Sequence, residues 1–474
     1  MKQISNLILP FLVVAYLNAG QALAQDTSAK APRQFSLKQA QDYAVENNKN
    51  VKNARIDTEL AKKKIWETTA IGLPQLSATA NYQHIFKVPS MNFPSTQLSP
   101  DFIQFNPSTS YGTISGISDG DGGMIYLNSV PGAEIKLGVP DNFTLDVTLS
   151  QLVFSGAYLV GLQASKVYYM MSDQSLEKSE IDTRESVANS YFLALNLDQN
   201  MKIVSQSYQN ILKTLSDMRE MLNMGFIENT DVDQIELTSV NLSNTLKTLE
   251  RQHNAVKDLL KFQLGLPLEN DIELTDDFNA ILGSVNLEQI EGRQFNVENN
   301  ITYKILSTQE QLGNLNLKRE QSGYLPSVSA FYRHSEKLKK ADFDFTMKDI
   351  AGVALNIPIF SSGQRNAMVA ERKMELEKIR NSKMLATDGL KLDFINARNE
   401  FRTSYEKYLN EKHNVDLASK IYDKIQIKYK EGLSGSLDLT TAQNQYLTAQ
   451  SNYFTAAYNV LAAKNKLDKL TNNQ

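Results

Sequence analysis

Residues 149–156 read LSQLVFSG, and residues 355–363 read LNIPIFSSG. Each stretch passes from an alternating segment through Phe-Ser to a glycine, after which a long helical pattern begins. Gly225 and Gly432 then follow at the same distance in the two halves of the chain. Two copies of one long supersecondary unit indicate that the chain arose by duplication.

Each copy has the same order of expected elements: a helix, two strands that flank a loop, a very long helix and a returning helix. The first copy is predicted at 25–267, with strands at about 75–86 and 143–154 and an extracellular loop between them at about 87–142. A linking segment follows at 268–296. The second copy is predicted at 297–474, with strands at about 326–335 and 350–360.

The long helices carry a coiled-coil pattern. Neither Pro nor a pair of glycines interrupts the chain from Ala157 to Asn223, and a helix over this stretch is about 100 Å long. Its apolar residues alternate in steps of four and three at Leu197, Met201, Val204, Tyr208, Ile211, Leu215, Met218 and Leu222. Such a heptad stripe faces a partner helix along a supercoil. We therefore expect these helices to be buried against other long helices rather than in one compact core.

The strands alternate with a period of two. In the segment from Phe143 to Val153, five apolar residues fall on one face and the Thr, Asp and Ser residues fall on the other. The five are Phe143, Leu145, Val147, Leu149 and Val153. A strand with one lipid side and one wet side has this pattern, and so does an ordinary half-buried hairpin. Four strands cannot close a barrel, and an open edge in lipid leaves backbone groups unpaired at several kcal/mol each. If the strands lie in a membrane, several chains must complete the barrel.

The loop of the first copy is rich in Ser, Gly, Pro and aromatic residues. Its aromatic side chains suit either the lipid interface or packing within the loop; they are Phe86, Phe93, Phe102, Phe105, Tyr111 and Tyr126.

The first 24 residues predict a secretory signal peptide. Lys2 is followed by an apolar stretch at 7–17 and by Ala22-Leu23-Ala24, which has small residues at the spacing of a cleavage site. No other apolar run is long enough for a transmembrane helix. We therefore expect an exported chain that is periplasmic, secreted or a β-barrel.

Composition argues against several kinds of chemistry. The chain has no Cys, which excludes disulfides and thiolate chemistry, and its formal net charge of −4 gives no basic excess for nucleic acid. The four histidines are scattered without metal-ligand spacing, so we expect no catalytic set, no metal and no cofactor. His253 falls on the stripe of the returning helix and is expected to be a packed side chain, and core packing is also expected for Trp66.

Four features, present in both copies and in order, make the chain resemble the TolC family of outer-membrane efflux and secretion channels. They are the opening helix at 36–48, the Leu-Pro joints at 73–74 and 325–326, the strand-to-helix joints at 151–156 and 358–363, and the turns at 225–231 and 432–438. The joint residues are Pro74, Pro326, Phe154, Phe360, Gly156 and Gly363.

The resemblance implies a mainly α fold with a small membrane β component. It implies a homotrimer whose 12-stranded β-barrel in outer-membrane lipid is continued by a long α-helical coiled-coil barrel in the periplasm. It further implies a passive exit duct, gated at its periplasmic tip, in a tripartite efflux or type I secretion system. The partners would be a periplasmic adaptor protein and an inner-membrane efflux pump or ABC exporter. The cargo is not indicated.

The turns carry acidic residues at matching places. Asp231 and Asp233 follow Gly225, and Asp438 follows Gly432. Acids in the first turn of a helix favour its dipole by about 0.3–1 kcal/mol, with Asn229, Thr230 or Ser436 as the expected cap. In a trimer each Asp would also form a ring of charges that attracts cations and resists closure. The two interpretations stay open.

The resemblance assigns further roles at these turns. Asp438 matches a constriction aspartate, although the second such position is Thr441. Tyr429 and Asp231 match a pair that helps to hold the tip closed, but Ser434 replaces the basic residue of that network. An adaptor would contact the tip positions Gly225, Gly432, Leu433 and Ser434. The two glycines would equally suit ordinary helix C-caps.

A non-conducting coiled-coil stalk of the cell envelope is the alternative function. An exported hydrolase would need a catalytic set that this sequence lacks.

Overall fold

The computed structural model describes residues 34–92, 134–136, 138–340, 344 and 346–472. The described chain is mainly helical and forms two compact units, each built from both copies of the repeat. The sheet unit contains residues 57–174 and 304–385. The hub unit contains the described residues of 34–56, 175–303 and 386–474. The expected signal peptide and most of the aromatic loop residues lie outside the described residues.

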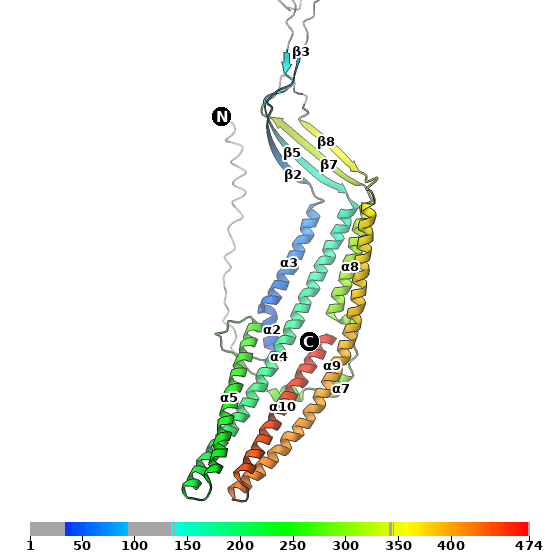
Figure 1. The fold of residues 1–474 in the computed structure, drawn as a ribbon. Helices are drawn as coiled ribbons and strands as arrows, with labels where there is room; N and C mark the ends of the chain where they lie inside the picture. The colour runs from blue at the N-terminus through cyan, green and yellow to red at the C-terminus, as the bar shows by residue number, and fades with distance from the viewer. Residues whose placement is uncertain (1–33, 93–133, 137, 341–343, 345, 473–474) are drawn as a thin grey trace, which may run out of the picture. The chain divides into compact units, whose positions relative to one another are not determined.

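The sheet unit is organised around one antiparallel sheet in the order β2-β5-β7-β8 (Figure 1). Its strands are β2 (Gln75–His84), β5 (Asp141–Phe154), β7 (Ser327–Lys337) and β8 (Asp349–Asn356). A short ribbon pairs β3 (Ser90–Asn92) with β4 (Glu134–Lys136). The hairpin strands of both copies therefore join into a single sheet, with β2 and β8 at its edges.

The register of the sheet gathers the apolar residues on one face. Paired residues share a face of a pleated sheet, and the pairs on the apolar face include Leu76 with Leu149, Ala78 with Val147, Leu149 with Tyr332, and Val328 with Leu355. The opposite face pairs Ser77 with Thr148 and Thr148 with Arg333. The alternation expected from the sequence is thus confirmed across all four strands.

The strand expected at 350–360 is shorter than predicted, because β8 ends at Asn356. Pro358 follows and has no N–H to donate to a neighbouring strand. The equivalent strand β5 continues to Phe154 and leads at once into helix α4. The two strand-to-helix joints therefore differ in length.

Long helices connect the elements of the two copies. They are α3 (Lys49–Ala70), α4 (Gly156–Asn223), α8 (Ile301–Ser322) and α9 (Gln364–Lys430), and each has residues in both units. Within the sheet unit, the Tyr158 hydroxyl of α4 donates to the Thr69 carbonyl near the end of α3 at 3.1 Å. The expectation that Trp66 packs in a core is wrong, because 64% of this α3 side chain is exposed.

The helical stretch that precedes Pro74 is interrupted at Asn48. Helix α2 (Leu37–Asn47) starts with a capping box in which Ser36 and Gln39 bond each other's backbone N–H. Asn48 then takes an extended conformation, and its amide donates to the Gln263 carbonyl at 2.7 Å while its oxygen accepts from Asn50 N–H. A side chain that bonds nearby backbone groups competes with the helix, and this explains the break.

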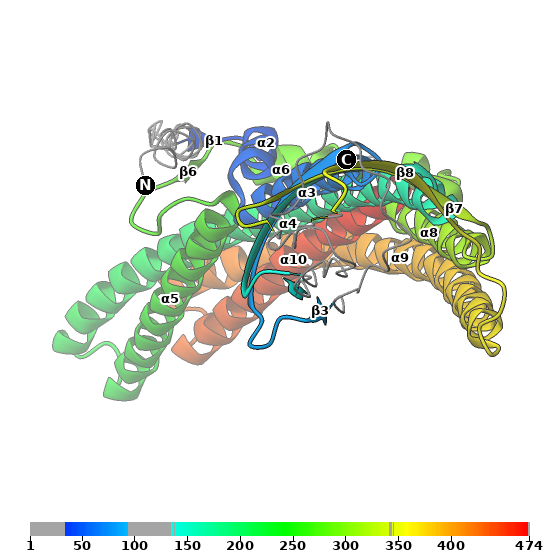
Figure 2. The same cartoon turned by 90° about the horizontal axis from the view of Figure 1, so that it is seen from above.

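The hub unit adds α5 (Asn229–Leu264), α6 (Phe278–Gly283), α7 (Leu287–Glu291), the 3-10 helix η2 (Val297–Asn299) and α10 (Ser436–Thr471). A short parallel ribbon pairs β1 (Gln34–Phe35) with β6 (Glu273–Leu274). Figures 1 and 2 show α5 beside α4 and α10 beside α9, each pair joined by a tight turn. The expected linking segment at 268–296 thus contains a strand and two short helices.

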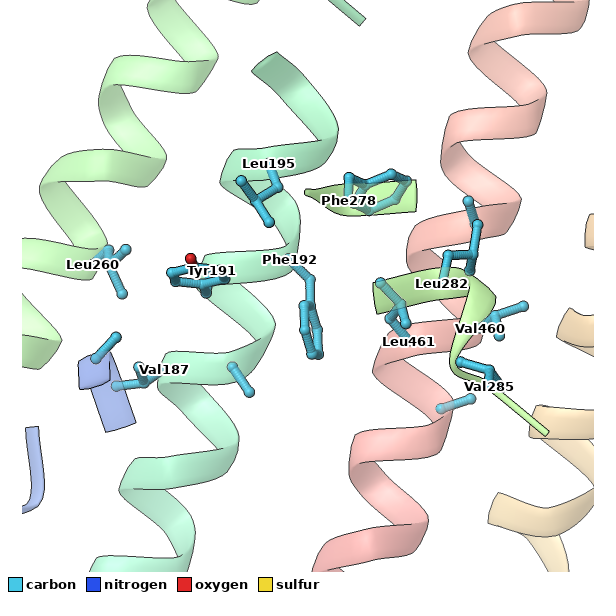
Figure 3. Close-up of a cluster of buried hydrophobic side chains, with 14 of the residues drawn as sticks. Val187, Tyr191, Phe192, Leu195, Leu260, Phe278, Leu282, Val285, Val460 and Leu461 are labelled. Carbon is cyan, nitrogen blue, oxygen red and sulfur yellow. The ribbon is translucent and has the colours of Figure 1, made fainter. Parts of the chain in front are cut away.

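The main core of the hub unit joins helices of both copies. Tyr191 and Phe192 of α4, Leu260 of α5, Phe278 of α6 and Leu461 of α10 belong to this one buried cluster (Figure 3). The Tyr191 hydroxyl is buried and donates to the Phe35 carbonyl at 2.9 Å, which ties the β1–β6 ribbon to α4. Burial raises the pKa of Tyr191 well above its ordinary value.

A second cluster lies along the predicted heptad stripe. The α4 residues expected there are buried or partly buried, together with Ile235, Leu242 and Leu249 of α5 and Tyr422 of α9. The coiled-coil prediction is therefore confirmed. In the described part of the chain, no helix combines the length and the apolar character needed to cross a membrane.

Candidate functional site

The two helical turns of the hub unit, which we call the tip turns, have the same backbone design. At the end of α4 the Gly225 N–H donates to the Leu222 carbonyl and the Phe226 N–H to the Met221 carbonyl, both at 2.9 Å. Gly432 makes the equivalent bond at the end of α9. Gly225 and Gly432 have φ values of 77° and 72°. Both turns are therefore Schellman caps, which need a residue in the left-handed region.

The tip turns present large apolar side chains to solvent. Met224 and Phe226 of the first turn are 63% and 72% exposed, and Leu433 and Leu437 of the second are 73% and 64% exposed. Scattered exposed apolar residues are normal, but gathered ones mark interaction sites. These four residues form a candidate contact surface.

Asp438 bonds to the start of its own helix. It accepts from the Ser434 hydroxyl at 2.8 Å and from the Gly435 N–H at 3.4 Å, and Gly435 is the N-cap of α10. The helix-end interpretation of Asp438 is thus supported, and its side chain stays exposed. Thr441 is also exposed one turn further along α10.

The predicted caps are wrong at both turns. The N-cap of α5 is Glu228, whose side chain accepts no capping hydrogen bond from a backbone N–H of the helix. Asn229 instead donates to Asp233 at 3.0 Å, and Thr230 donates to Glu228 at 3.3 Å. Ser436 is already the first residue of α10. The pattern of small polar residues indicated the helix starts but not which residue occupies the cap.

Asp231 joins the two tip turns. Its carboxylate accepts a short hydrogen bond from the Ser436 hydroxyl, which also lies 2.9 Å from the amide oxygen of Gln234. Ser436 is only 3% exposed. The contact connects residues far apart in the sequence, and for this reason no local motif indicated it.

Tyr429 lies close to this contact without bonding to it. Its hydroxyl is buried and has no hydrogen-bond partner among the described residues. Burial, followed by the nearby charge of Asp231, raises the pKa of Tyr429. Asp231 bonds to Ser436 rather than to Tyr429. The role that the resemblance assigns to the pair of Tyr429 and Asp231 stays a prediction.

The strand-to-helix joints use glycine for two different reasons. A Cβ atom on Gly156 would lie 2.9 Å from Leu325 and Ser322 side-chain atoms, so the two copies approach closely there. Gly363 has a φ of 81° and open space around it. Phe154 ends β5, whereas Phe360 is 84% exposed in the longer second joint. Pro74 and Pro326 each immediately precede a strand, as expected.

Two of the four histidines lie in equivalent polar clusters that sequence analysis missed. His84 is 2.8 Å from Asp141, which also accepts from the Tyr82 hydroxyl at 3.2 Å. In the second copy, His334 and the Tyr332 hydroxyl each lie 2.7 Å from Asp349. The signal was available as a repeated Tyr-x-His in the first strand of each hairpin. Within the described ranges no group of three or more His, Asp or Glu side chains could hold a metal.

Comparison with known proteins identifies the fold and gives a family match for the second copy. The family model of outer membrane efflux proteins matches residues 308–473. No curated protein sequence matches the chain.

Solved structures with a similar fold cover nearly all of the chain. CusC, described in terms of transmembrane channel formation, is 14% identical over 92% of this chain and 91% of its own, with a TM-score of 0.69. VceC of Vibrio cholerae is 14% identical over 92% and 95% of the two chains, with a TM-score of 0.66. The open state of MtrE of Neisseria gonorrhoeae is 15% identical over 93% and 89%, with a TM-score of 0.67.

The family match of residues 308–473 and the fold shared over nearly the whole chain together indicate its general role. It is an outer-membrane exit duct for efflux, located in the outer membrane and extending into the periplasm.

Proposed function

We propose that three copies of this outer membrane efflux protein form one passive channel with a shared β-barrel and a shared helical tunnel. The observation that carries the proposal is the four-stranded sheet, which has one apolar face and two edges, β2 and β8. An edge in lipid leaves backbone groups unpaired, and closure of the sheet removes that cost. Three chains would supply twelve strands, with β8 of one chain beside β2 of the next.

Long helices with exposed apolar residues support the same assembly. In the sheet unit, Leu60 and Trp66 of α3 are 60% and 64% exposed, and Met384 and Leu385 of α9 are 60% and 77% exposed. An isolated subunit would leave these side chains in water. Burial of a large apolar side chain stabilises an assembly by about 1.5–3 kcal/mol. Association of copies of the chain along these helices would therefore be favourable.

We further propose that the tip turns are the gate and the adaptor contact. The exposed apolar residues Met224, Phe226 and Leu433, beside Gly225, Gly432 and Ser434, would meet a periplasmic adaptor protein. An inner-membrane efflux pump or ABC exporter would supply the energy for transport. Asp438, Asp231, Asp233 and Tyr429 would control opening, with Thr441 in place of a second constriction acid.

Single-channel recording in planar bilayers tests the channel. The purified protein should insert as a trimer and conduct in discrete steps. The alternative, a non-conducting stalk, shares the helical seams but needs no lumen. A trimer that inserts and never conducts, even when an adaptor protein is present, would favour the stalk.

A further inference from the structure

The first strands of the two hairpins contain the same short motif. Residues 81–84 read NYQH in β2, and residues 331–334 read FYRH in β7. The shared Tyr and His lie on the apolar face of the sheet, because Tyr332 is paired with Leu149 and alternate residues point to opposite faces. The first and third residues of each motif therefore lie on the polar face. The two copies share the residues of one face and differ on the other.

The polar face of β7 carries a cation and an aromatic ring where β2 carries neutral amides. Phe331 and Arg333 stand at the places in the motif that Asn81 and Gln83 occupy in β2. Arg333 is paired with Thr148 of β5, and its side chain is exposed. It forms no ion pair with any residue that the structure describes. Its guanidinium group is therefore available to an anion from solution.

The ring of Phe331 lies against a glycine of the neighbouring strand. In the sheet β7 lies between β5 and β8, and Phe331 is paired with Gly352 of β8 (Figure 1). A Cβ atom on Gly352 would lie 2.8 Å from the Cζ atom of this ring, so the missing side chain leaves the space that the ring occupies. Ile350, which is paired with Arg333, adds an apolar side chain on the same face. A partly exposed apolar surface thus stands beside a cation, and we call the two residues the Phe331/Arg333 patch.

One acid lies near the patch without pairing to it. Asp146 of β5 is paired with Ser335, one step along the same face from Arg333. Such diagonal neighbours are about 7–8 Å apart, and no ion pair joins Asp146 to Arg333 in the described part of the sheet. Lys337, a second base on this face of β7, is 3.2 Å from Asp344. An approaching anion therefore meets an unpaired guanidinium group whose attraction Asp146 weakens.

We infer that the Phe331/Arg333 patch binds small aromatic anions inside the channel. The inference rests on the proposed trimer, in which the apolar face of the sheet contacts lipid and the polar face lines the lumen. A carboxylate pairs with the guanidinium group of Arg333, and the aromatic body of the same molecule packs on the ring of Phe331. Rings of Arg side chains are typical of pores that accept anions. The patch thus favours anionic aromatic cargo over cationic cargo at the barrel.

The test is the block of single-channel current by 2-naphthoate, an aromatic carboxylate. Phe331→Asn and Arg333→Gln each install the residue that the first hairpin carries at the same place in the motif. The dissociation constant for 2-naphthoate should rise about two- to fivefold in Arg333→Gln, as for an exposed ion pair. It should rise about two- to tenfold in Phe331→Asn through loss of the ring contact. Gln83→Arg, the reverse change in the first hairpin, should lower it instead.

Two further probes and the salt concentration separate the charge from the ring. 2-Naphthylmethylamine keeps the ring as a cation, and acetate keeps the carboxylate without a ring, so both should block far less than 2-naphthoate. Raising the salt from 0.1 to 1 M shortens the screening length from about 10 to about 3 Å. This change should weaken the block in the wild type and have little effect in Arg333→Gln. Asp146→Asn should strengthen the block. Trimer migration and helicity must match the wild type in every variant.

The outcomes separate the patch from the channel, because ligand-observed NMR on the detergent-solubilised protein measures 2-naphthoate binding without conductance. If wild-type channels conduct and 2-naphthoate blocks the wild type and both β7 variants equally, the patch assignment is wrong and the channel stands. If Phe331→Asn alone changes the block, the ring serves to cover Gly352 and the anion site is again wrong. If no form conducts while Arg333→Gln still weakens binding, the patch stands and the proposed channel is wrong. If 2-naphthoate neither binds nor blocks the wild type, the inference is wrong.

Discussion

Three glycines with nearly identical backbone angles should respond differently to the same substitution. Gly225, Gly265 and Gly432 have φ values of 77°, 74° and 72°, and each ends a long helix in a Schellman cap. A Cβ atom at Gly225 or Gly432 would meet nothing within 4 Å, whereas at Gly265 it would lie 2.5 Å from the carbonyl oxygen of Asn47. Alanine at each position separates backbone strain from steric contact.

The expected magnitudes follow from these two terms. Alanine in the left-handed region costs about 1–2 kcal/mol, and the lower entropy of its unfolded chain returns about 0.4–1 kcal/mol. Gly225→Ala and Gly432→Ala should therefore cost about 0–1.6 kcal/mol. Gly265→Ala must in addition displace the backbone at Asn47, and overpacking of this kind typically costs a further 1–3 kcal/mol.

Hydrogen exchange measured by mass spectrometry on the detergent-solubilised protein can resolve this difference. In Gly265→Ala, peptides from the end of α5 and from the break at Asn48 should exchange about five- to a hundredfold faster than in wild type, in proportion to the added 1–3 kcal/mol. In Gly432→Ala only the tip turn should change, and Gly432→Asn should recover part of the loss because Asn tolerates this conformation. Equal losses at positions 265 and 432 would refute the steric argument.

Three further predictions concern charge, pH and the hub core. Asp438→Ala should weaken cation selectivity of the channel, and unchanged selectivity would confine Asp438 to its helix-end bonds. Burial, followed by the charge of Lys257, lowers the pKa of His253 in the folded protein. Because the unfolded chain then binds more protons, the free energy of unfolding should fall as the pH drops below about 6.5. Thermal unfolding between about pH 7.5 and 5.5 should show a smaller pH dependence in His253→Gln than in the wild type. Tyr191→Phe leaves buried backbone groups with fewer partners and should lower the free energy of unfolding by about 1–3 kcal/mol; a change below 0.5 kcal/mol would show that the Phe35 contact contributes little.

The elements with a local period could be predicted from the sequence. The heptad stripe of α4 lies in the buried seam because a steady 3.5-residue repeat has only one face to bury. The strands could be placed to within a few residues because their alternation matches the pleat. The break at Asn48 was not predicted, since it depends on a bond to the carbonyl of Gln263, which is distant in the sequence.

The parts of the site that depend on distant residues could not be derived from periodicity. The lone tryptophan of α3, Trp66, suggests core packing from its residue type, yet 64% of its side chain is exposed. Similarly, Ser436 reads as a helix cap because small polar residues usually act locally at such positions. Its partner Asp231 belongs to the other copy of the repeat, and only the packed structure brings the two together.

The two tip turns share one backbone design, but their aspartates have different surroundings. Asp231 and Asp438 stand at the same distance from Gly225 and Gly432, but the first is bonded across the copies and the second to its own helix start. A carboxylate in a buried contact is poorly placed to attract ions, whereas an exposed one keeps its field in the solvent. In the proposed trimer the cation-attracting ring should therefore come mainly from Asp438, whereas Asp231 should mainly stabilise the contact between the two tip turns. Neutralising Asp438 should then change selectivity more than opening, and neutralising Asp231 should do the reverse.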